Sequence, residues 1–193
     1  MSKTTDRASW LRVDNIVNPA PAIAAMWDES RSRLGYVREF LKMPFEADRL
    51  ALFQGYVNRL MRSDDCLLSG RERELIALVV SLENRCEACT ITHAGALQAH
   101  GMDKRTVDVL LANWRRADLS EREQALAAFA SNLTLHPDKA NEGDLTLLRE
   151  AGLAEIELLE IVQIVAIFNA TNRLNAGLGI KVDSGAFDAF RSS

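Results

Sequence analysis

The sequence has few of the signals that mark β-strands, and it has no hydrophobic run long enough to cross a membrane. It shows no sustained alternation of apolar and polar residues between turns, and no Asn-Gly or Asp-Gly dipeptide typical of tight hairpins. Its most apolar stretches, Leu75 to Leu82 and Ile161 to Phe168, are far shorter than the roughly 20 residues that a membrane span needs. We therefore expect an all-α protein that is not inserted in a membrane.

Positive charge is also scarce, because 23 basic residues stand against 27 acidic ones and the net charge at pH 7 is -4. A surplus of Lys and Arg is what neutralises nucleic-acid phosphates or an acidic membrane surface. We therefore expect neither a nucleic-acid partner nor a membrane partner. The segment from Met1 to Arg7 is polar and lacks the apolar region of a secretory signal, so the expected location is the cytoplasm.

Only three cysteines occur in 193 residues, an odd number that does not form a disulfide framework. Cys66 stands alone, whereas Cys86 and Cys89 form a C-x-x-C pair. No second C-x-x-C and no H-x-x-x-H completes a four-ligand zinc site, and Thr90 stands where a c-type haem motif needs histidine. We expect no cofactor. Two readings stay open at this point: a metal held by the pair, His93 and a carboxylate, and a pair of buried cysteines that serve only as small hydrophobes.

Helical patterns fill the chain, with apolar residues recurring at spacings of three and four. Ser69 with Glu72, and Ser120 with Glu123, have the spacing of a capping box. The predicted helices cover 22–34, a short segment before Pro44, 48–61, 69–82, 86–98, 106–112, 120–135, 144–151 and 154–174. We expect one compact all-α domain, with an N-terminal helical layer in 1–68, a helical core in 69–182 and a tail in 183–193.

The C-x-x-C pair lies at the predicted amino terminus of the helix 86–98, and this position favours reactive cysteines. At 3.6 residues per turn, Cys86, Cys89 and His93 share one face of that helix. A helix amino terminus, a nearby imidazole and the C-x-x-C arrangement each lower the pKa of a cysteine. A thiolate attacks peroxide oxygen, and a second thiol can then condense with the sulfenic acid to form a reducible disulfide.

The same residues carry a family resemblance. The string E-x-x-C-x-x-C-x-x-x-H from Glu83 to His93 follows an apolar helix that begins with R-x-R-E-L. It resembles the core motif of the alkylhydroperoxidase D and carboxymuconolactone decarboxylase superfamily. Later segments occur in the order that this superfamily shows, and Trp27 and Gly35 in a helical arm are similar to its peroxidase-related subgroup. These later segments are His100-Gly101, Ser120 to Glu123, Leu148 to Leu153 and Phe168 to Arg173.

The resemblance implies a single-domain helical bundle of the alkylhydroperoxidase D-like type and a cofactor-free, thiol-dependent peroxidase. It assigns Cys89 as the peroxidatic cysteine and Cys86 as the resolving one. His93 and Glu74, which precedes the first cysteine by twelve residues, would form the proton relay. Glu83 also belongs to the family string, and two roles are open for it: it orients His93, or it only places negative charge near the amino terminus of the motif helix.

The resemblance also implies partners. These are a hydroperoxide substrate, a dithiol reductant protein of the lipoyl or thioredoxin type, and further copies of the chain in a dimer, trimer or hexamer. One position departs from the family pattern, because Ala88 stands where the well-known alkylhydroperoxidase has histidine. This difference puts the efficiency of the proton relay in question.

Two other functions stay open. One is a non-redox enzyme like carboxymuconolactone decarboxylase, a branch that generally lacks the cysteine pair. The other is a redox-sensing or metal-binding protein without turnover. In the last long helix, Asn169, Asn172 and Arg173 are expected to have structural roles, because buried polar groups need hydrogen-bond partners.

Overall fold

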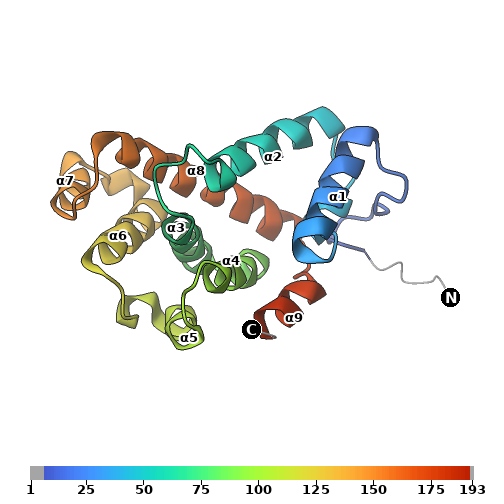
Figure 1. Ribbon diagram of the computed structural model, residues 1–193. Coiled ribbons are helices and arrows are strands. Elements are labelled where there is room, and N and C mark those ends of the chain that lie inside the picture. Colours follow the sequence, from blue (N-terminus) through green and yellow to red (C-terminus); the bar gives the residue numbers. More distant parts are fainter. Residues whose placement is uncertain (1–6, 192–193) are drawn as a thin grey trace.

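The computed structural model describes residues 7–191, in which nine α-helices and three short 3-10 helices follow one another without a strand (Figure 1). The prediction of an all-α protein is confirmed. None of the helices within this range combines the length and apolar character that a bilayer span requires. The elements are α1 (Pro21–Leu34), η1 (Glu39–Lys42), α2 (Ala47–Arg62), α3 (Gly70–Glu83), α4 (Glu87–Ala99), α5 (Lys104–Asn113), η2 (Trp114–Arg116), α6 (Glu121–Leu135), η3 (Pro137–Lys139), α7 (Glu142–Glu150), α8 (Glu155–Leu178) and α9 (Ser184–Arg191).

Helix α3 forms the centre of the main hydrophobic core. Its seven consecutive residues from Leu75 to Ser81 are all buried, which is typical of a helix surrounded by protein on every side. Helices α4, α6 and α8 pack against it. Figure 1 shows the long helix α8 running from α7 at one end of the molecule towards α1 at the other. The residues of α3 are therefore enclosed between α4 and α8.

A second, smaller hydrophobic cluster joins the N-terminal helices. Ile23 of α1, Leu41 of η1 and Leu50 of α2 are its buried members. Phe53 of α2 packs against this cluster and also against the main core, so α2 links the two. A division of the chain at residue 68 stays a prediction. Residues 1–6 of the expected N-terminal layer and residues 192–193 of the expected tail lie outside the described residues.

Both capping boxes predicted from the sequence are present. The Ser69 side chain accepts a hydrogen bond from the Glu72 backbone, and the Glu72 carboxylate accepts one from the Ser69 backbone. Ser120 and Glu123 form the same reciprocal pair at the start of α6. Each box satisfies backbone N–H groups that would otherwise have no partner in the first helical turn.

The two capping glutamates also connect their helices. Arg71 of α3 binds Glu123 at 2.7 Å, and Arg122 of α6 binds Glu72 at 2.6 Å. Arg122 also reaches Glu157 of α8 at 2.5 Å. The side chains of Glu72, Glu123 and Glu157 are each at most 15 % exposed, so their charges depend on these guanidinium partners. The amino termini of α3, α6 and α8 are thereby held together.

The segment from residue 183, expected as a tail, contains a helix. The chain there forms helix α9, which packs against α4. Ala186 is buried, and the buried Asp183 carboxylate accepts a hydrogen bond from the Glu39 backbone at 2.6 Å. The sequence does not indicate this helix because it has only eight residues and Gly185 lies in its first turn. Tertiary contacts with α4 and α1 hold this helix in place, and Asp183 just before it is bonded to η1.

The ion-pair network predicts a difference between two arginine substitutions. Arg122→Leu leaves Glu72 and Glu157 without their partner, and we expect the free energy of unfolding to fall by about 2 kcal/mol. Arg149→Leu removes an exposed pair with Glu155, whose side chain is 72 % exposed, and should lower the free energy of unfolding much less. Urea unfolding of both variants measures the difference. Equal losses would contradict a structural role for the Arg122 network.

Candidate active site

A sharp turn between α3 and α4 sets the position of the cysteine pair. Arg85 has a φ of 54°, in the left-handed region that favours glycine, and reverses the chain directly after α3. The Cys86 backbone N–H donates to the Ser81 carbonyl at 3.0 Å, which closes the end of α3. Cys86 is in turn the N-cap residue of α4. The first motif cysteine is therefore fixed at the junction of two packed helices.

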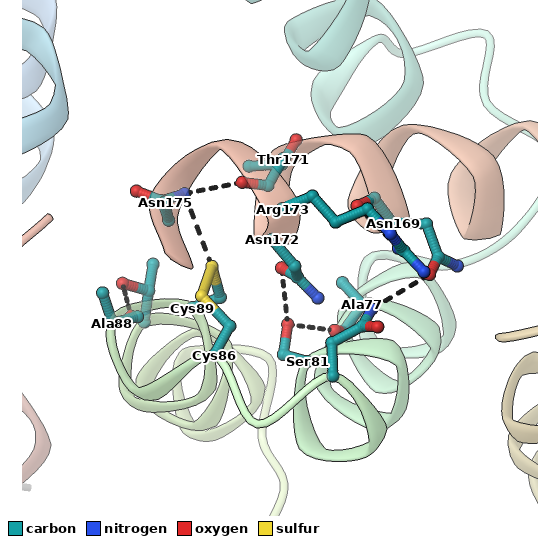
Figure 2. Close-up of a disulfide and its surroundings, with 12 residues drawn as sticks. Ala77, Ser81, Cys86, Ala88, Cys89, Asn169, Thr171, Asn172, Arg173 and Asn175 are labelled. Atoms are coloured by element: carbon teal, nitrogen blue, oxygen red, sulfur yellow. Dashed lines mark hydrogen bonds between the residues drawn. A yellow bond between two sulfur atoms is a disulfide. The ribbon is translucent and has the colours of Figure 1, made fainter. Parts of the chain in front are cut away.

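The two motif cysteines are bonded to each other at the start of α4. Cys86 and Cys89 form a disulfide with their Cα atoms 5.4 Å apart. Figure 2 shows the sulfur atoms between α4 and the last turns of α8. Their residues are only 4 % and 6 % exposed. The unpaired backbone N–H groups of the first turn give this end of a helix a positive potential, which favours a thiolate once the disulfide is reduced.

His93 and Glu74 form a hydrogen-bonded pair in the same helical hairpin. Glu74 lies seven residues before Ser81 and His93 seven after Cys86, so the antiparallel packing of α3 and α4 brings them together. His93 Nδ1 and Glu74 Oε2 are 2.7 Å apart, and the two side chains are only 10 % and 15 % exposed. An ionised carboxylate only accepts hydrogen bonds, so Nδ1 is the donor in this pair and Nε2 lies outside the contact.

The imidazole of His93 is also held by an aromatic ring. The ring of Phe168 on α8 meets it edge to face, with 4.6 Å between the ring centroids. Side chains from α3 and α8 thus hold the His93 imidazole of α4. Glu74 and His93, the two residues assigned to a relay by the family resemblance, are in contact with each other in the same hairpin as the cysteines, and their role stays a prediction.

Comparisons with known proteins agree with this arrangement. The family model described as the carboxymuconolactone decarboxylase family matches residues 48–132. The uncharacterized peroxidase-related protein from Silicibacter sp. TM1040 is 27% identical, with a TM-score of 0.84 over 97% of this chain and 100% of that one. The family model and the similar structures together support the alkylhydroperoxidase D and carboxymuconolactone decarboxylase superfamily. The resemblance inferred from the motif is confirmed, including its peroxidase-related character.

Other solved structures have a similar fold. An uncharacterized peroxidase-related protein from Ralstonia eutropha JMP134, described as an alkylhydroperoxidase AhpD core, is 27% identical. Its TM-score is 0.76 over 90% of this chain and 95% of that one. The apo debrominase Bmp8 is 19% identical, with a TM-score of 0.77 over 94% of this chain and 98% of that one, and this likeness shows the fold alone. No protein in the curated comparison matches significantly.

Glu83, the other glutamate of the superfamily string, lies among different partners. Its Oε1 accepts hydrogen bonds from Ser131 at 2.6 Å, Trp114 at 2.9 Å and Arg115 at 3.2 Å. Burial raises the pKa of Glu83, but the Ser131 and Trp114 hydrogen bonds and the Arg115 charge outweigh it, so the pKa lies below the ordinary value. The structure brings Glu74, and not Glu83, to His93. Glu83 instead joins the end of α3 to η2 and α6.

Two asparagines of α8 have the structural contacts that the sequence led us to expect. The Asn169 side-chain oxygen accepts a hydrogen bond from Asn84 at 3.0 Å, just after α3. The Asn172 side-chain oxygen accepts one from Ser81 within α3 at 3.4 Å. Arg173 donates to the Asn169 side chain within α8 itself. The polar side chains of α8 therefore join it to α3 (Figure 2).

A third asparagine on α8 was missed by the sequence reasoning. Asn175 is buried, and its side-chain nitrogen lies 3.6 Å from Cys89 Sγ (Figure 2). The signal was present, because asparagine at 169, 172 and 175 repeats every three residues along the buried side of a helix. The sequence does not reveal the register between α8 and α4. This register determines which of the three asparagines contacts Cys89.

Cys66, the third cysteine, lies away from the pair, and no group of side chains suits a metal ion within the described residues. The Cys66 thiol lies after α2 and contacts the carbonyl oxygens of Arg59 and Leu60 at 3.4 and 3.3 Å. It is separate from the disulfide. Within residues 7–191, no three His, Cys, Asp or Glu side chains are grouped in a way that could hold a metal ion.

The position of Glu83 predicts a pH-dependent effect on stability. Because its pKa is lower in the folded state than in the unfolded chain, its contribution is complete above the unfolded value of about 4.3 and is lost as the pH falls through the folded value. Glu83→Gln should lower the free energy of unfolding by about 1 kcal/mol at neutral pH. Urea unfolding at several pH values should show the difference shrinking below about pH 4. A difference that stays constant in acid would contradict this.

Proposed function

We propose that the protein is a thiol-dependent peroxidase that reduces hydroperoxides without a metal or organic cofactor. The observation that carries the proposal is the Cys86–Cys89 disulfide at the amino terminus of α4, in the same hairpin as the buried His93–Glu74 pair. Two thiols able to bond to each other and a nearby proton carrier are the groups that peroxide reduction requires. The peroxidase-related relatives support the same assignment.

In the oxidative half of the proposed cycle, the Cys89 thiolate attacks the terminal oxygen of a hydroperoxide. The O–O bond breaks, the alkoxide leaving group takes a proton to become an alcohol, and Cys89 becomes a sulfenic acid. The thiol of Cys86 then attacks this sulfur. Its proton and the sulfenic hydroxyl leave as water, and the S–S bond seen in the structure is formed. One hydroperoxide is thereby reduced by two electrons from the two thiols.

The proton movements are assigned to His93 and Glu74. Since Glu74 occupies Nδ1, Nε2 is the nitrogen that takes the thiol proton from Cys89 and returns it to the leaving alkoxide. The imidazolium formed in between is stabilised by the adjacent carboxylate. Ala88 adds no imidazole of its own, so the proposed relay depends on one histidine. Glu83 is assigned a structural role, on the basis of its contacts with Ser131 and Trp114.

In the reductive half, an external dithiol restores the two cysteines. One of its thiolates opens the disulfide, and its second thiol releases the resulting mixed disulfide, so two electrons and two protons return to the protein. We assign this role to a reductant protein of the lipoyl or thioredoxin type. We also propose a homo-oligomer, as a dimer, trimer or hexamer, that works in the cytoplasm. The apolar side chains of Ile156 and Leu159 on the outer face of α8 are consistent with contacts between copies.

Substitution of the two cysteines tests the proposed cycle. Cys89→Ser should abolish hydroperoxide consumption with a dithiol reductant, because the attacking sulfur is lost. Cys86→Ser should reduce one hydroperoxide and stop with a sulfenic acid on Cys89. Peroxide loss and intact mass after trapping the sulfenic acid measure these outcomes.

The matched control for both variants is Cys66→Ser, which removes a thiol outside the pair and should keep full activity. Undiminished turnover in both Cys86→Ser and Cys89→Ser would refute the proposed function. A disulfide that forms once with peroxide and is never turned over with any dithiol would instead favour a redox sensor.

Glu74 is tested separately, because it acts through His93 and is therefore a positioning residue. Glu74→Gln should lower kcat by about 10–100-fold, since it removes the charge that supports the imidazolium. It should leave KM nearly unchanged, because Glu74 acts through His93 on proton transfer and not on hydroperoxide binding. The control is Glu87→Gln, which neutralises an exposed carboxylate in the first turn of α4. Equal kcat values for Glu74→Gln and the wild type would contradict the relay.

A further inference from the structure

The side-chain amide of Asn175 points at one sulfur of the pair. Its Nδ2 lies 3.6 Å from Cys89 Sγ, a hydrogen-bonding distance for a sulfur acceptor, and Figure 2 shows this contact linking α8 to α4. Asn175 is only 9 % exposed, and Cys89 is only 6 % exposed. A donor and a sulfur therefore meet where water has little access.

The orientation of this amide is fixed by a second contact. Nδ2 also donates to the Thr171 carbonyl at 3.0 Å, one turn earlier on α8. A carbonyl oxygen only accepts hydrogen bonds, so the NH₂ group, and not the amide oxygen, must face both Thr171 and Cys89. One N–H is bound to the backbone and the other is directed at the sulfur. The amide is thus a preorganised donor.

The last turn of α8 is itself well anchored. The Asn175 carbonyl accepts the backbone N–H of Ile180 at 2.9 Å, and Gly179 ends the helix in the left-handed conformation at φ 60°. The Trp10 backbone N–H donates to the Leu178 carbonyl at 2.9 Å, so the N-terminal segment also holds this turn. A donor on this anchored turn keeps its direction when Cys89 changes between disulfide and thiolate.

We propose that Asn175 is a further catalytic residue, whose amide N–H stabilises the Cys89 thiolate. The inference rests on the proposed function, because it concerns the same reacting sulfur. Burial disfavours a thiolate, and a hydrogen bond donated to the charged form offsets this cost and lowers the pKa of the thiol. The amino terminus of α4 and the Asn175 amide act on Cys89 from two different helices.

This contact also distinguishes the two sulfurs. Cys86 is the N-cap residue of α4 and makes no side-chain capping hydrogen bond, whereas Cys89 receives the Asn175 donor. In thiol–disulfide exchange, the sulfur with the lower thiol pKa leaves faster. The reductant thiolate therefore attacks Cys86, a mixed disulfide forms there, and the electron pair of the broken S–S bond goes to Cys89. The second reductant thiol then frees Cys86.

The test measures the thiol pKa of Cys89 directly. In a Cys66→Ser, Cys86→Ser background Cys89 is the sole thiol of the chain, and its titration is followed by ultraviolet thiolate absorbance and by the pH dependence of alkylation. Asn175→Leu removes the donor at similar volume and should raise the pKa by about one unit, a tenfold loss of thiolate at low pH. Asn175→Ala, which removes the donor without crowding, should shift the pKa in the same direction.

The matched control is Asn169→Leu, which removes an asparagine from the same helix and leaves the Asn175 contact in place. It should leave the pKa of Cys89 unchanged, although it removes the hydrogen bond to Asn84. Circular dichroism identifies the variants that are folded. Unchanged Cys89 pKa values in the folded Asn175 variants would overturn the inference, even with normal peroxide turnover. Absence of turnover in the wild type would count against the proposed function alone, because the titration needs no peroxide.

Discussion

The tight turn from α3 into α4 is the constraint on which the site depends. One residue in the left-handed conformation, Arg85, and one hydrogen bond from the Cys86 backbone to Ser81 place the end of a buried helix directly before the start of another. The same turn fixes both pairs of functional groups. It holds Cys86 and Cys89 at the positive end of α4, and it aligns the two helices so that Glu74 meets His93.

Helix α8 completes the site from the other side. Phe168 contacts the His93 ring, Asn172 accepts from Ser81, and Asn175 donates towards Cys89. These contacts lie on one buried side of a single helix, so a small change in its register would disturb all of them together. The ion pairs of Arg122 with α3 and α8 act at the other end of the same helices and resist such a change. Packing and polar contacts thus position the reactive sulfur jointly.

The superfamily fold accommodates more than one chemistry, and the side chains of the site decide between them. This chain has the cysteine pair and the hydrogen-bonded Glu74–His93 pair within a fold that it shares with peroxidase-related proteins and with a debrominase. The proposal of thiol chemistry, and not lactone decarboxylation, rests on these two pairs. The second glutamate of the motif, Glu83, shows that membership of a motif and a place in the site are different properties. Its carboxylate is already occupied by Ser131, Trp114 and Arg115.

The helical class, both capping boxes and the C-x-x-C pair at a helix start could be predicted from the residues alone, because these are local patterns. The partnership of Glu74 with His93 came from the resemblance of the motif to a known family. The tertiary structure alone decided the place of Glu83, the helix at Ser184–Arg191 and the contact of Asn175 with Cys89. Each of these depends on which faces of distant helices meet. That register is set by side-chain packing across the whole core, and no short stretch of sequence contains it.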